Sequence, residues 1–266
     1  MKLKNLHLYI PNTLTLTNLL LGCVGIIYAF DERYFLISEI GSYSGLYDTQ
    51  EINSRIFFSS MIIIVAAVID FADGFFARLL NAQSEIGKQL DSLADVVTFG
   101  VLPGMLLYQL LERAYFSETG ALLTSKIYLL PALLLPLAAA YRLARFNIEP
   151  ISKEYFRGLA TPAMAFFVAS LPLIYFTNSN GLGAYVINKY FLYAVALLFS
   201  YLMVSDIRMF SLKLKSWRIR ENVAIYSFLG LCLISLAWLK YTGVAISLIL
   251  YILFSIFIIR VPDVEE

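Results

Sequence analysis

Four aspartates, Asp70, Asp73, Asp91 and Asp95, lie within apolar, helix-forming sequence. A carboxylate inside a membrane helix is costly and usually marks a function. Asp70 and Asp73 share one helical face, and Asp91 and Asp95 are one turn apart on the next helix. Two helices can therefore direct four carboxylates toward one point. Because four anions at such a point repel one another, the pattern favours hard divalent cations such as Mg²⁺ or Mn²⁺.

The segment that holds these aspartates has the spacing D-x2-D-G-x2-A-R-x8-G-x3-D-x3-D. This spacing resembles the signature of the CDP-alcohol phosphotransferase family. The eight residues that carry the resemblance are Asp70, Asp73, Gly74, Ala77, Arg78, Gly87, Asp91 and Asp95. A match at eight fixed positions is specific, and the competing interpretation is a structural set of buried acids paired with nearby arginines.

The resemblance implies a metal-dependent transfer reaction, in which an alcohol attacks the β-phosphate of a CDP-linked lipid and CMP is released. Two divalent cations, Mg²⁺ or Mn²⁺, would neutralise the pyrophosphate. Asp70, Asp73 and Asp91 are the expected principal ligands. Asp95 is the expected general base and also a candidate metal ligand.

Six residues are expected to bind the CDP-lipid: Asn12, Thr15, Gly74, Ala77, Arg78 and Ser84. The small residues leave room for the nucleotide, and the arginine offers a planar fork of donors to phosphate. The family also places a small hydroxyl and a Pro-x-x-x-Thr stretch near the nucleotide, which assigns Ser84, Asn12 and Thr15. The alternative for the Pro-x-x-x-Thr stretch is an ordinary helix start.

A weaker signature concerns the acceptor alcohol. The stretches R-L-A-R-F-N at 142–147 and F-R-G-L-A-T-P-A at 156–163 resemble segments of the membrane-integral phosphatidylserine synthases, although Ala160 stands where these enzymes often carry Pro. This resemblance implies that CDP-diacylglycerol is the donor and L-serine the acceptor, with phosphatidylserine as the product.

Three residues of the first stretch are the candidates for acceptor binding. Arg142 and Arg145 are one helical turn apart and could hold the serine carboxylate or a lipid phosphate. Asn147 could add a hydrogen bond to the amino acid. The alternative for the two arginines is a pair of cationic anchors at a helix end.

Two other functions compete with this interpretation. Within the same chemistry, the acceptor could be glycerol 3-phosphate or inositol phosphate, which would need a dense basic pocket. In a different class, an ion-coupled transporter could also bury acids in broken helices. A transporter would not need a nucleotide cradle beside its acids, and it would release no CMP.

Composition places the chain in a membrane. Its 266 residues are 60% hydrophobic and 15% charged, with a mean hydropathy of +0.75. A net charge of +1 argues against a nucleic-acid partner, and the single histidine, His7, argues against a histidine-based metal site or triad. Two cysteines in apolar segments imply no disulfide framework.

The fold class predicted from this pattern is an all-α, polytopic membrane helix bundle. Apolar runs of spanning length predict eight helices. They lie at roughly 14–30, 55–80, 91–112, 127–146, 160–177, 186–206, 222–240 and 243–260. A loop is expected at 31–54.

We expect a six-helix catalytic core at 1–210, followed at 211–266 by a basic loop and two further helices. The distribution of Lys and Arg predicts cytoplasmic N- and C-termini and an active site at the cytoplasmic face of the cell membrane. The family resemblance implies a homodimer surrounded by membrane lipids.

Overall fold

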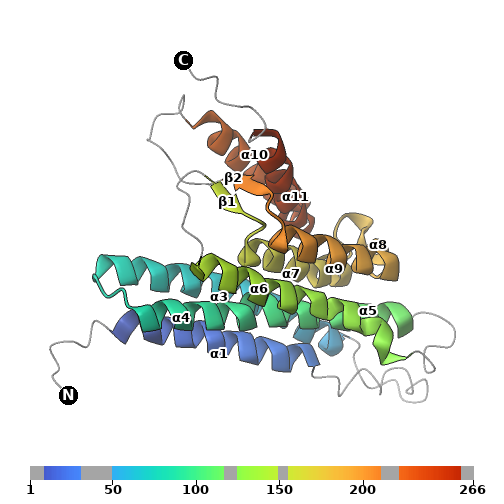
Figure 1. The fold of residues 1–266 in the computed structure, drawn as a ribbon. Coiled ribbons are helices and arrows are strands. Elements are labelled where there is room, and N and C mark those ends of the chain that lie inside the picture. The colour runs from blue at the N-terminus through green and yellow to red at the C-terminus, as the bar shows by residue number, and fades with distance from the viewer. Residues whose placement is uncertain (1–8, 31–49, 117–124, 149–154, 211–221, 259–266) are drawn as a thin grey trace.

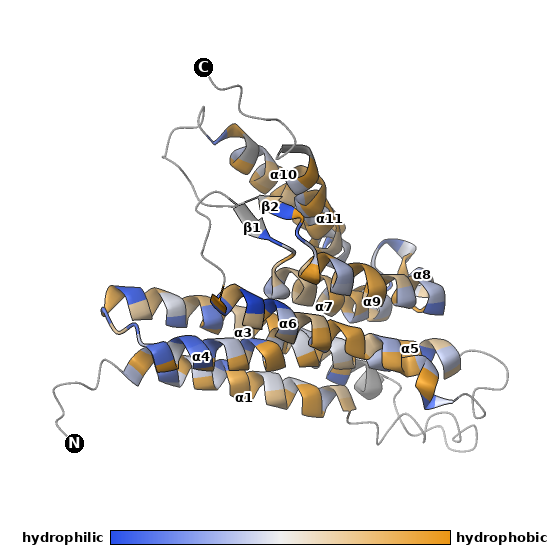
Figure 2. Cartoon of the chain, viewed as in Figure 1, coloured by the Kyte–Doolittle hydropathy of each residue, from blue (hydrophilic) through white to orange (hydrophobic). Residues whose placement is uncertain are grey.

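The structure, a computed structural model, describes residues 9–30, 50–116, 125–148, 155–210 and 222–258. These residues form a bundle of mainly apolar helices (Figures 1 and 2). Its α-helices are α1 (Ile10–Phe30), α3 (Gln50–Leu79), α4 (Glu85–Asp95), α5 (Leu102–Phe116), α6 (Leu134–Ile148), α7 (Thr161–Thr177), α8 (Gly183–Val186), α9 (Lys189–Val204), α10 (Val223–Leu239) and α11 (Tyr241–Ile258). The predicted fold class, a polytopic helical membrane bundle, is confirmed.

Shorter elements join or extend these helices. A π-helical segment, η2 (Val96–Val101), connects α4 to α5, and a 3₁₀ segment, η4 (Lys126–Leu133), precedes α6. A second 3₁₀ turn, η5 (Ser179–Gly181), follows α7. Two three-residue strands, β1 (Tyr155–Arg157) and β2 (Arg208–Phe210), pair in antiparallel register, with Phe156 opposite Met209.

Four helical stretches are long and apolar enough to cross a membrane: Ile10–Phe30, Arg55–Leu79, Glu85–Phe116 and Lys126–Ile148. Four shorter apolar helices have 10–17 residues within the described parts of the chain. The structure therefore supports a protein with several spans, and the count of eight spans stays a prediction.

The predicted boundaries differ most around the second and third helices. We expected these helices at 55–80 and 91–112, but they begin at Gln50 and Glu85. Hydropathy marks only the apolar part of a helix, whereas both helices start in polar sequence. The expected loop therefore ends before Gln50, and its remaining residues lie outside the described part of the chain.

A tight turn brings α4 back along α3. The amide of Ala82 donates to the carbonyl of Ala77 at 2.9 Å, and the amide of Asn81 donates to that of Arg78 at 3.3 Å. Asn81 has a φ of 49°, the left-handed conformation that ends many helices and that Asn tolerates well. Ser84 then caps α4 by accepting a hydrogen bond from the amide of Gly87. The turn therefore brings the end of α3 beside the start of α4.

Helix α1 packs into the angle between α3 and the α4–α5 stretch. Its buried residues recur every three or four positions, at Pro11, Thr15, Asn18, Gly22, Gly25 and Ala29. A Cβ atom on Gly22 would lie 2.5 Å from the Thr98 hydroxyl oxygen, and one on Gly25 would lie 2.5 Å from a methyl carbon of Leu102. The small residues therefore allow the backbones to approach closely, as in other membrane bundles.

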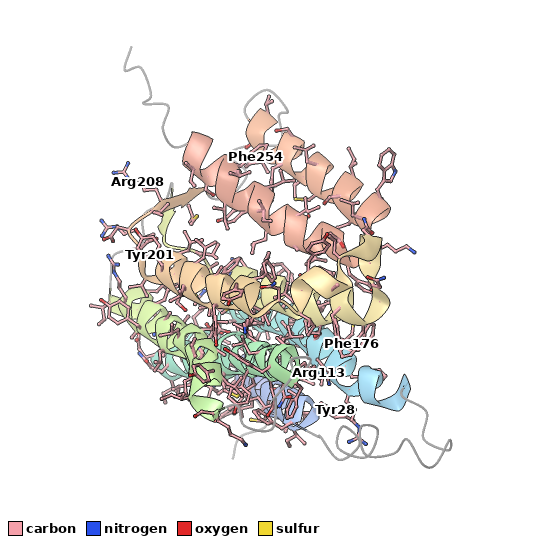
Figure 3. The ribbon with its side chains drawn as sticks, turned by 90° about the vertical axis from the view of Figure 1, so that its right-hand side faces the viewer. Tyr28, Arg113, Phe176, Tyr201, Arg208 and Phe254 are labelled. Atoms are coloured by element: carbon pink, nitrogen blue, oxygen red, sulfur yellow. The ribbon has the colours of Figure 1, made fainter. Side chains whose placement is uncertain are left out.

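Polar and aromatic residues separate toward opposite ends of the bundle. Hydrophilic residues gather on α4 and the nearby ends of its neighbours (Figure 2). At the far end of α5, the Arg113 guanidinium lies 4.9 Å from the ring centre of Phe176 (Figure 3). The hydroxyls of Tyr115 and Tyr193 are 2.6 Å apart there, and Lys189 lies over the Tyr115 ring. Such aromatic and cationic clusters are typical of a membrane–water boundary.

The last two helices form a hairpin that rises at a steep angle from the layer of α1, α4, α5 and α6 (Figure 1). Within it, a Cβ atom on Gly243 would lie 2.3 Å from the carbonyl oxygen of Ser235. Helix α11 packs against α7 and β2, so the hairpin contacts the preceding helices directly. The basic stretch between β2 and α10, residues 211–221, lies outside the described residues.

The close packing of α1 gives a testable expectation. Gly22→Ala places a methyl group against Thr98, and overpacking of this kind costs about 1–3 kcal/mol. We therefore expect a lower Tm for the detergent-solubilised variant. Gly230→Ala in α10 is the matched control, because no atom lies within 4 Å of its added Cβ. A Gly22→Ala protein at least as stable as the Gly230→Ala protein would contradict the packing account.

Candidate active site

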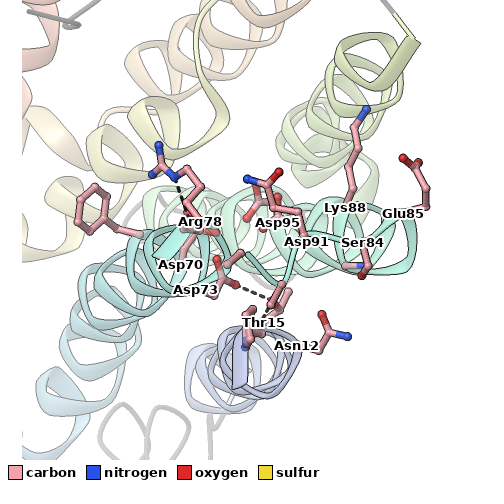
Figure 4. Close-up of a pocket in the computed structure, with 17 residues that line it drawn as sticks. Asn12, Thr15, Asp70, Asp73, Arg78, Ser84, Glu85, Lys88, Asp91 and Asp95 are labelled. Carbon is pink, nitrogen blue, oxygen red and sulfur yellow. Dashed lines mark hydrogen bonds between the residues drawn. The ribbon is translucent and has the colours of Figure 1, made fainter. Parts of the chain in front are cut away.

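A polar cavity of about 890 Å³ opens between the N-terminal end of α1, the C-terminal end of α3 and α4 (Figure 4). All ten residues predicted for the metals and the CDP-lipid line it: Asn12, Thr15, Asp70, Asp73, Gly74, Ala77, Arg78, Ser84, Asp91 and Asp95. The three residues predicted for the acceptor do not line this cavity. The structure thus brings the first group together and leaves the second apart from it.

Three of the four aspartates form one cluster. Carboxylate oxygens of Asp70, Asp91 and Asp95 all lie within 4.8 Å of one another. Asp73 lies beside them (Figure 4), but its Oδ2 accepts a hydrogen bond of 2.6 Å from the hydroxyl of Thr15. Asp73 thus lies next to the cluster with one oxygen bonded to Thr15, and its place among the expected principal ligands, Asp70, Asp73 and Asp91, stays a prediction.

The cluster has the character of a cation site. Asp95 Oδ1 is buried and has no hydrogen-bond partner among the described residues. A buried, unpaired carboxylate oxygen is costly, and two further carboxylates beside it increase the repulsion. Oxygen ligands of this kind are the ones that Mg²⁺ and Mn²⁺ prefer. The residues present therefore fit a divalent cation.

Helix α1 contributes a contact that the sequence did not reveal. We expected Thr15 to line the cytidine pocket, and it does line the cavity. Its hydroxyl also fixes the orientation of Asp73, and both side chains are buried. The only signal in the sequence was the place of Thr15 on the small-residue stripe of α1.

The end of α3 provides an open surface with a cationic side chain. A Cβ atom on Gly74 would meet nothing within 4 Å, so this glycine faces free space in the cavity. Arg78 lies one turn further on, and its Nε donates to the Gly74 carbonyl at 3.0 Å. Lys88 and Gln83 also line the cavity. Sequence reasoning missed both, because they fall at variable positions between the fixed residues.

The start of α4 is packed closely against α1. A Cβ atom on Gly87 would lie 3.0 Å from Ser84 Oγ and 3.1 Å from Asn12 Oδ1. Ser84 Oγ accepts from the Gly87 amide at 3.0 Å, which gives this hydroxyl a structural role as a helix cap. Its predicted contact with the nucleotide stays a prediction.

The candidate acceptor residues lie in the last turns of α6 and have different partners. Arg142 is half-buried and interacts electrostatically with the Asp95 carboxyl and with Tyr251 of α11. Its Nε is buried and has no hydrogen-bond partner among the described residues. Of the three candidates, Arg142 therefore has the clearest relation to the aspartate cluster.

The other two candidates join α6 to neighbouring elements. Arg145 forms an ion pair with Asp206, and its guanidinium holds the pKa of the Asp206 carboxyl below its usual range. Asn147 Nδ2 donates to the Ser92 hydroxyl of α4 at 2.8 Å. Because a helix has 3.6 residues per turn, Asn147 is rotated by about 140° from Arg142. Arg145 and Asn147 therefore have structural partners, and the binding of the acceptor by the three residues stays a prediction.

Comparisons with known proteins agree with this geometry. The family model for CDP-alcohol phosphatidyltransferase matches residues 8–202. A protein of Helicobacter pylori named CDP-diacylglycerol–serine O-phosphatidyltransferase is 28% identical over 237 residues, which cover 87% of this chain and 84% of the relative. A protein of the same name from Bacillus subtilis is 33% identical over 68% of this chain and 88% of the relative. One from Methanocaldococcus jannaschii is 33% identical over 56% of this chain and 62% of the relative.

The family match covers α1 to nearly the end of α9 and includes every residue that lines the cavity. Together with the long apolar helices, it identifies an integral membrane protein with a phosphotransferase site. This chain belongs to the CDP-alcohol phosphatidyltransferase family.

Proposed function

We propose that the protein transfers the phosphatidyl group of CDP-diacylglycerol to L-serine, which yields phosphatidylserine and CMP. The observation that carries this proposal is the gathering of all eight signature residues around one cavity, with three carboxylates in a cluster at its wall. The choice of serine is supported by the names of the relatives.

The residues divide the chemistry between them. A divalent cation, Mg²⁺ or Mn²⁺, would be held by Asp70, Asp91 and Asp95 and would offset charge on the pyrophosphate. Two such ions are expected, with Asp73 as a further ligand. Arg78 lies where its guanidinium can donate to a phosphate, and open space beside Gly74 gives the nucleotide room.

Asp95 has the second role, as acceptor of the proton that the serine hydroxyl loses. The serine oxygen forms a bond to the β-phosphorus, and the bond from that phosphorus to the oxygen of CMP breaks. Arg142 is proposed to bind the serine carboxylate, because its guanidinium interacts electrostatically with the Asp95 carboxyl and would attract an anion near the same cluster. Arg145 and Asn147 are proposed to assist acceptor binding from positions where each also has a structural partner.

The surrounding organisation is also proposed. The catalytic core would be residues 1–210, with the α10–α11 hairpin as an addition that packs on α7. The termini and the cavity would face the cytoplasm, where serine and Mg²⁺ are available, and two copies of the chain would form a homodimer. The Lys and Arg distribution supports the orientation.

The direct test is to incubate purified protein with CDP-diacylglycerol and a panel of alcohols and to identify the lipid product. Serine should give phosphatidylserine with release of CMP. If glycerol 3-phosphate or inositol phosphate is the preferred acceptor, the proposed phosphatidyl transfer still holds but serine is not the acceptor. Absence of CMP with every acceptor would contradict the proposal.

Loss of a cluster carboxylate should remove nearly all turnover. Asp70→Asn and Asp91→Asn each delete a negative charge from the proposed metal site. Chelator should have the same effect on the unaltered protein, and Mg²⁺ or Mn²⁺ should restore its activity but not that of the variants. The measurement is CMP release in washed proteoliposomes. Full activity in a stringently metal-free preparation would refute the metal requirement.

The contact between Thr15 and Asp73 should contribute measurably to turnover. A hydrogen bond to a charged group contributes about 1.5–3 kcal/mol, so we expect Thr15→Val to lower kcat/KM by roughly 10- to 100-fold, whereas Thr15→Ser should retain most activity. Thr17→Val is the control, because this exposed hydroxyl donates only to the Thr13 carbonyl of its own helix. Equal kinetics in the two Val variants would show that the contact is dispensable.

The two arginines should differ in their effect on serine. Arg142→Lys should raise the KM for serine and leave that for CDP-diacylglycerol nearly unchanged, because an ammonium does not reproduce a bidentate fork. Arg142→Ala removes the side chain and should weaken serine binding by about 2–5 kcal/mol if the serine carboxylate stays desolvated. Arg145→Lys should have the smaller effect, since Arg145 pairs with Asp206.

Steady-state kinetics with varied serine give this comparison. Ethanolamine, which lacks the carboxylate, should abolish most of the difference between the Arg142 variants and the unaltered protein. Unchanged serine kinetics in both arginine positions would move the acceptor site elsewhere.

A further inference from the structure

A buried amide on α1 has no structural partner. Asn18 is fully buried, and neither its Oδ1 nor its Nδ2 has a hydrogen-bond partner among the described residues. An amide that leaves water without a partner costs free energy, so most buried amides in proteins are paired. A position that retains such a group calls for a partner that the side chain can reach.

The antiparallel packing of α1 against α3 indicates that Asn18 lies level with Asp70. Thr15 bonds to Asp73, and the Ser59 hydroxyl donates to the carbonyl of Gly25 at 2.8 Å. These two contacts show that α1 and α3 run antiparallel. The residue one turn after Thr15 is therefore level with the residue one turn before Asp73. Asn18 and Asp70 are those residues.

The packing of α1 against α4 and η2 indicates that the Asn18 side chain also lies near the level of Asp95. These two stretches run in parallel: Asn12 contacts the position of Gly87, and the Thr98 hydroxyl donates to the Asn18 carbonyl at 3.1 Å. Side chains on a helix tilt toward its N-terminus. The Asn18 amide therefore points from the level of Thr98 back toward the level of Asp95, one turn earlier.

Two complementary unpaired groups thus lie at the same level on packed helices. Within the described parts of the chain, Asn18 Nδ2 is a donor without an acceptor, and Asp95 Oδ1 is an acceptor without a donor. We propose that Asn18 is a positioning residue that donates a hydrogen bond from Nδ2 to the Asp95 carboxylate and orients it in the metal-bearing cluster. The inference rests on the proposed function, because it assigns Asp95 to a cation site.

This contact has a clear physical purpose. A carboxylate that binds a cation through one oxygen is held in place when its other oxygen accepts a hydrogen bond from the protein. Loss of such an outer partner typically weakens metal binding by about 10- to 100-fold. Asn18 would supply that bond from the apolar side of the cluster, where water has no access to it.

The test measures Mn²⁺ binding directly, by electron paramagnetic resonance of the free ion, in the full chain in nanodiscs without substrate. Asn18→Leu, which keeps the approximate volume without a donor, should weaken binding by about 10- to 100-fold. Asn18→Gln, which retains the amide, should recover part of that loss. Ser60→Ala is the matched control, because it also removes a buried, unpartnered polar atom, ten residues from Asp70 along α3.

A double-mutant cycle identifies the partner. If Asn18 acts through Asp95, the Asn18→Leu change should have little further effect on Mn²⁺ binding in an Asp95→Asn protein. Unchanged Mn²⁺ affinity in a folded Asn18→Leu protein, or an equal loss in both backgrounds, would overturn the proposal. If Asn18→Leu does not fold, Asn18→Ala gives the same comparison with a smaller side chain that also lacks a donor.

The result also separates this inference from the proposed function. An unaltered protein that binds no Mn²⁺ would refute the metal site and the role of Asn18 together. An unaltered protein that binds Mn²⁺, with an Asn18→Leu protein that binds it equally well, would refute the role of Asn18 alone.

Discussion

Mutual repulsion among carboxylates in a membrane bundle is the constraint on which the rest of this structure depends. Three carboxylate groups lie within 4.8 Å of one another, and a fourth is fixed beside them by a hydroxyl of α1. Such a group of charges destabilises the fold unless cations and donors compensate it. The arrangement is therefore costly in isolation, and the neighbouring helices must be stable enough to hold it.

Small residues on α1 meet this requirement. Gly22 and Gly25 allow the backbone of α1 to contact η2 and α5, and Ser59 bonds to the Gly25 carbonyl from the other side. Close packing of this kind stabilises membrane helices, for which the lipid offers no hydrophobic drive to associate. The same stripe carries Thr15, whose hydroxyl bonds to Asp73, and Asn18, which lies one turn further along α1. The surface that holds the bundle together thus also supplies a polar group, the Thr15 hydroxyl, to the cavity.

The features predicted from the sequence are those that short-range spacing determines. Helical periodicity placed Asp70 with Asp73 and Asp91 with Asp95, and the signature identified Gly74, whose added Cβ would meet only open space. Apolar runs located the helices but not their polar first turns. The cavity itself followed from the motif, because all eight fixed positions lie within 26 residues of sequence joined by one turn.

The features that the sequence could not provide depend on packing between distant elements. Fifty-eight positions separate Thr15 from Asp73, and sixty-one separate Arg145 from Asp206. No periodicity reports such pairs, so neither the hydrogen bond between Thr15 and Asp73 nor the ion pair between Arg145 and Asp206 could be expected from the sequence. The sequence alone does not give the register of α1 against its neighbours, so it shows Asn18 only as one polar residue in an apolar helix.

The π-helical segment η2 sets the rotation of α4 relative to α5. A π turn accommodates one more residue than an α turn, and it often marks an insertion at a functional site. Removal of one residue from 96–101 would rotate everything before it by about 100° relative to α5. Asp91 and Asp95 would then face away from α3 while the apolar face of α5 kept its place. The direction in which the Asp91 and Asp95 side chains face is thus set by the length of this six-residue segment, independently of the packing of α5.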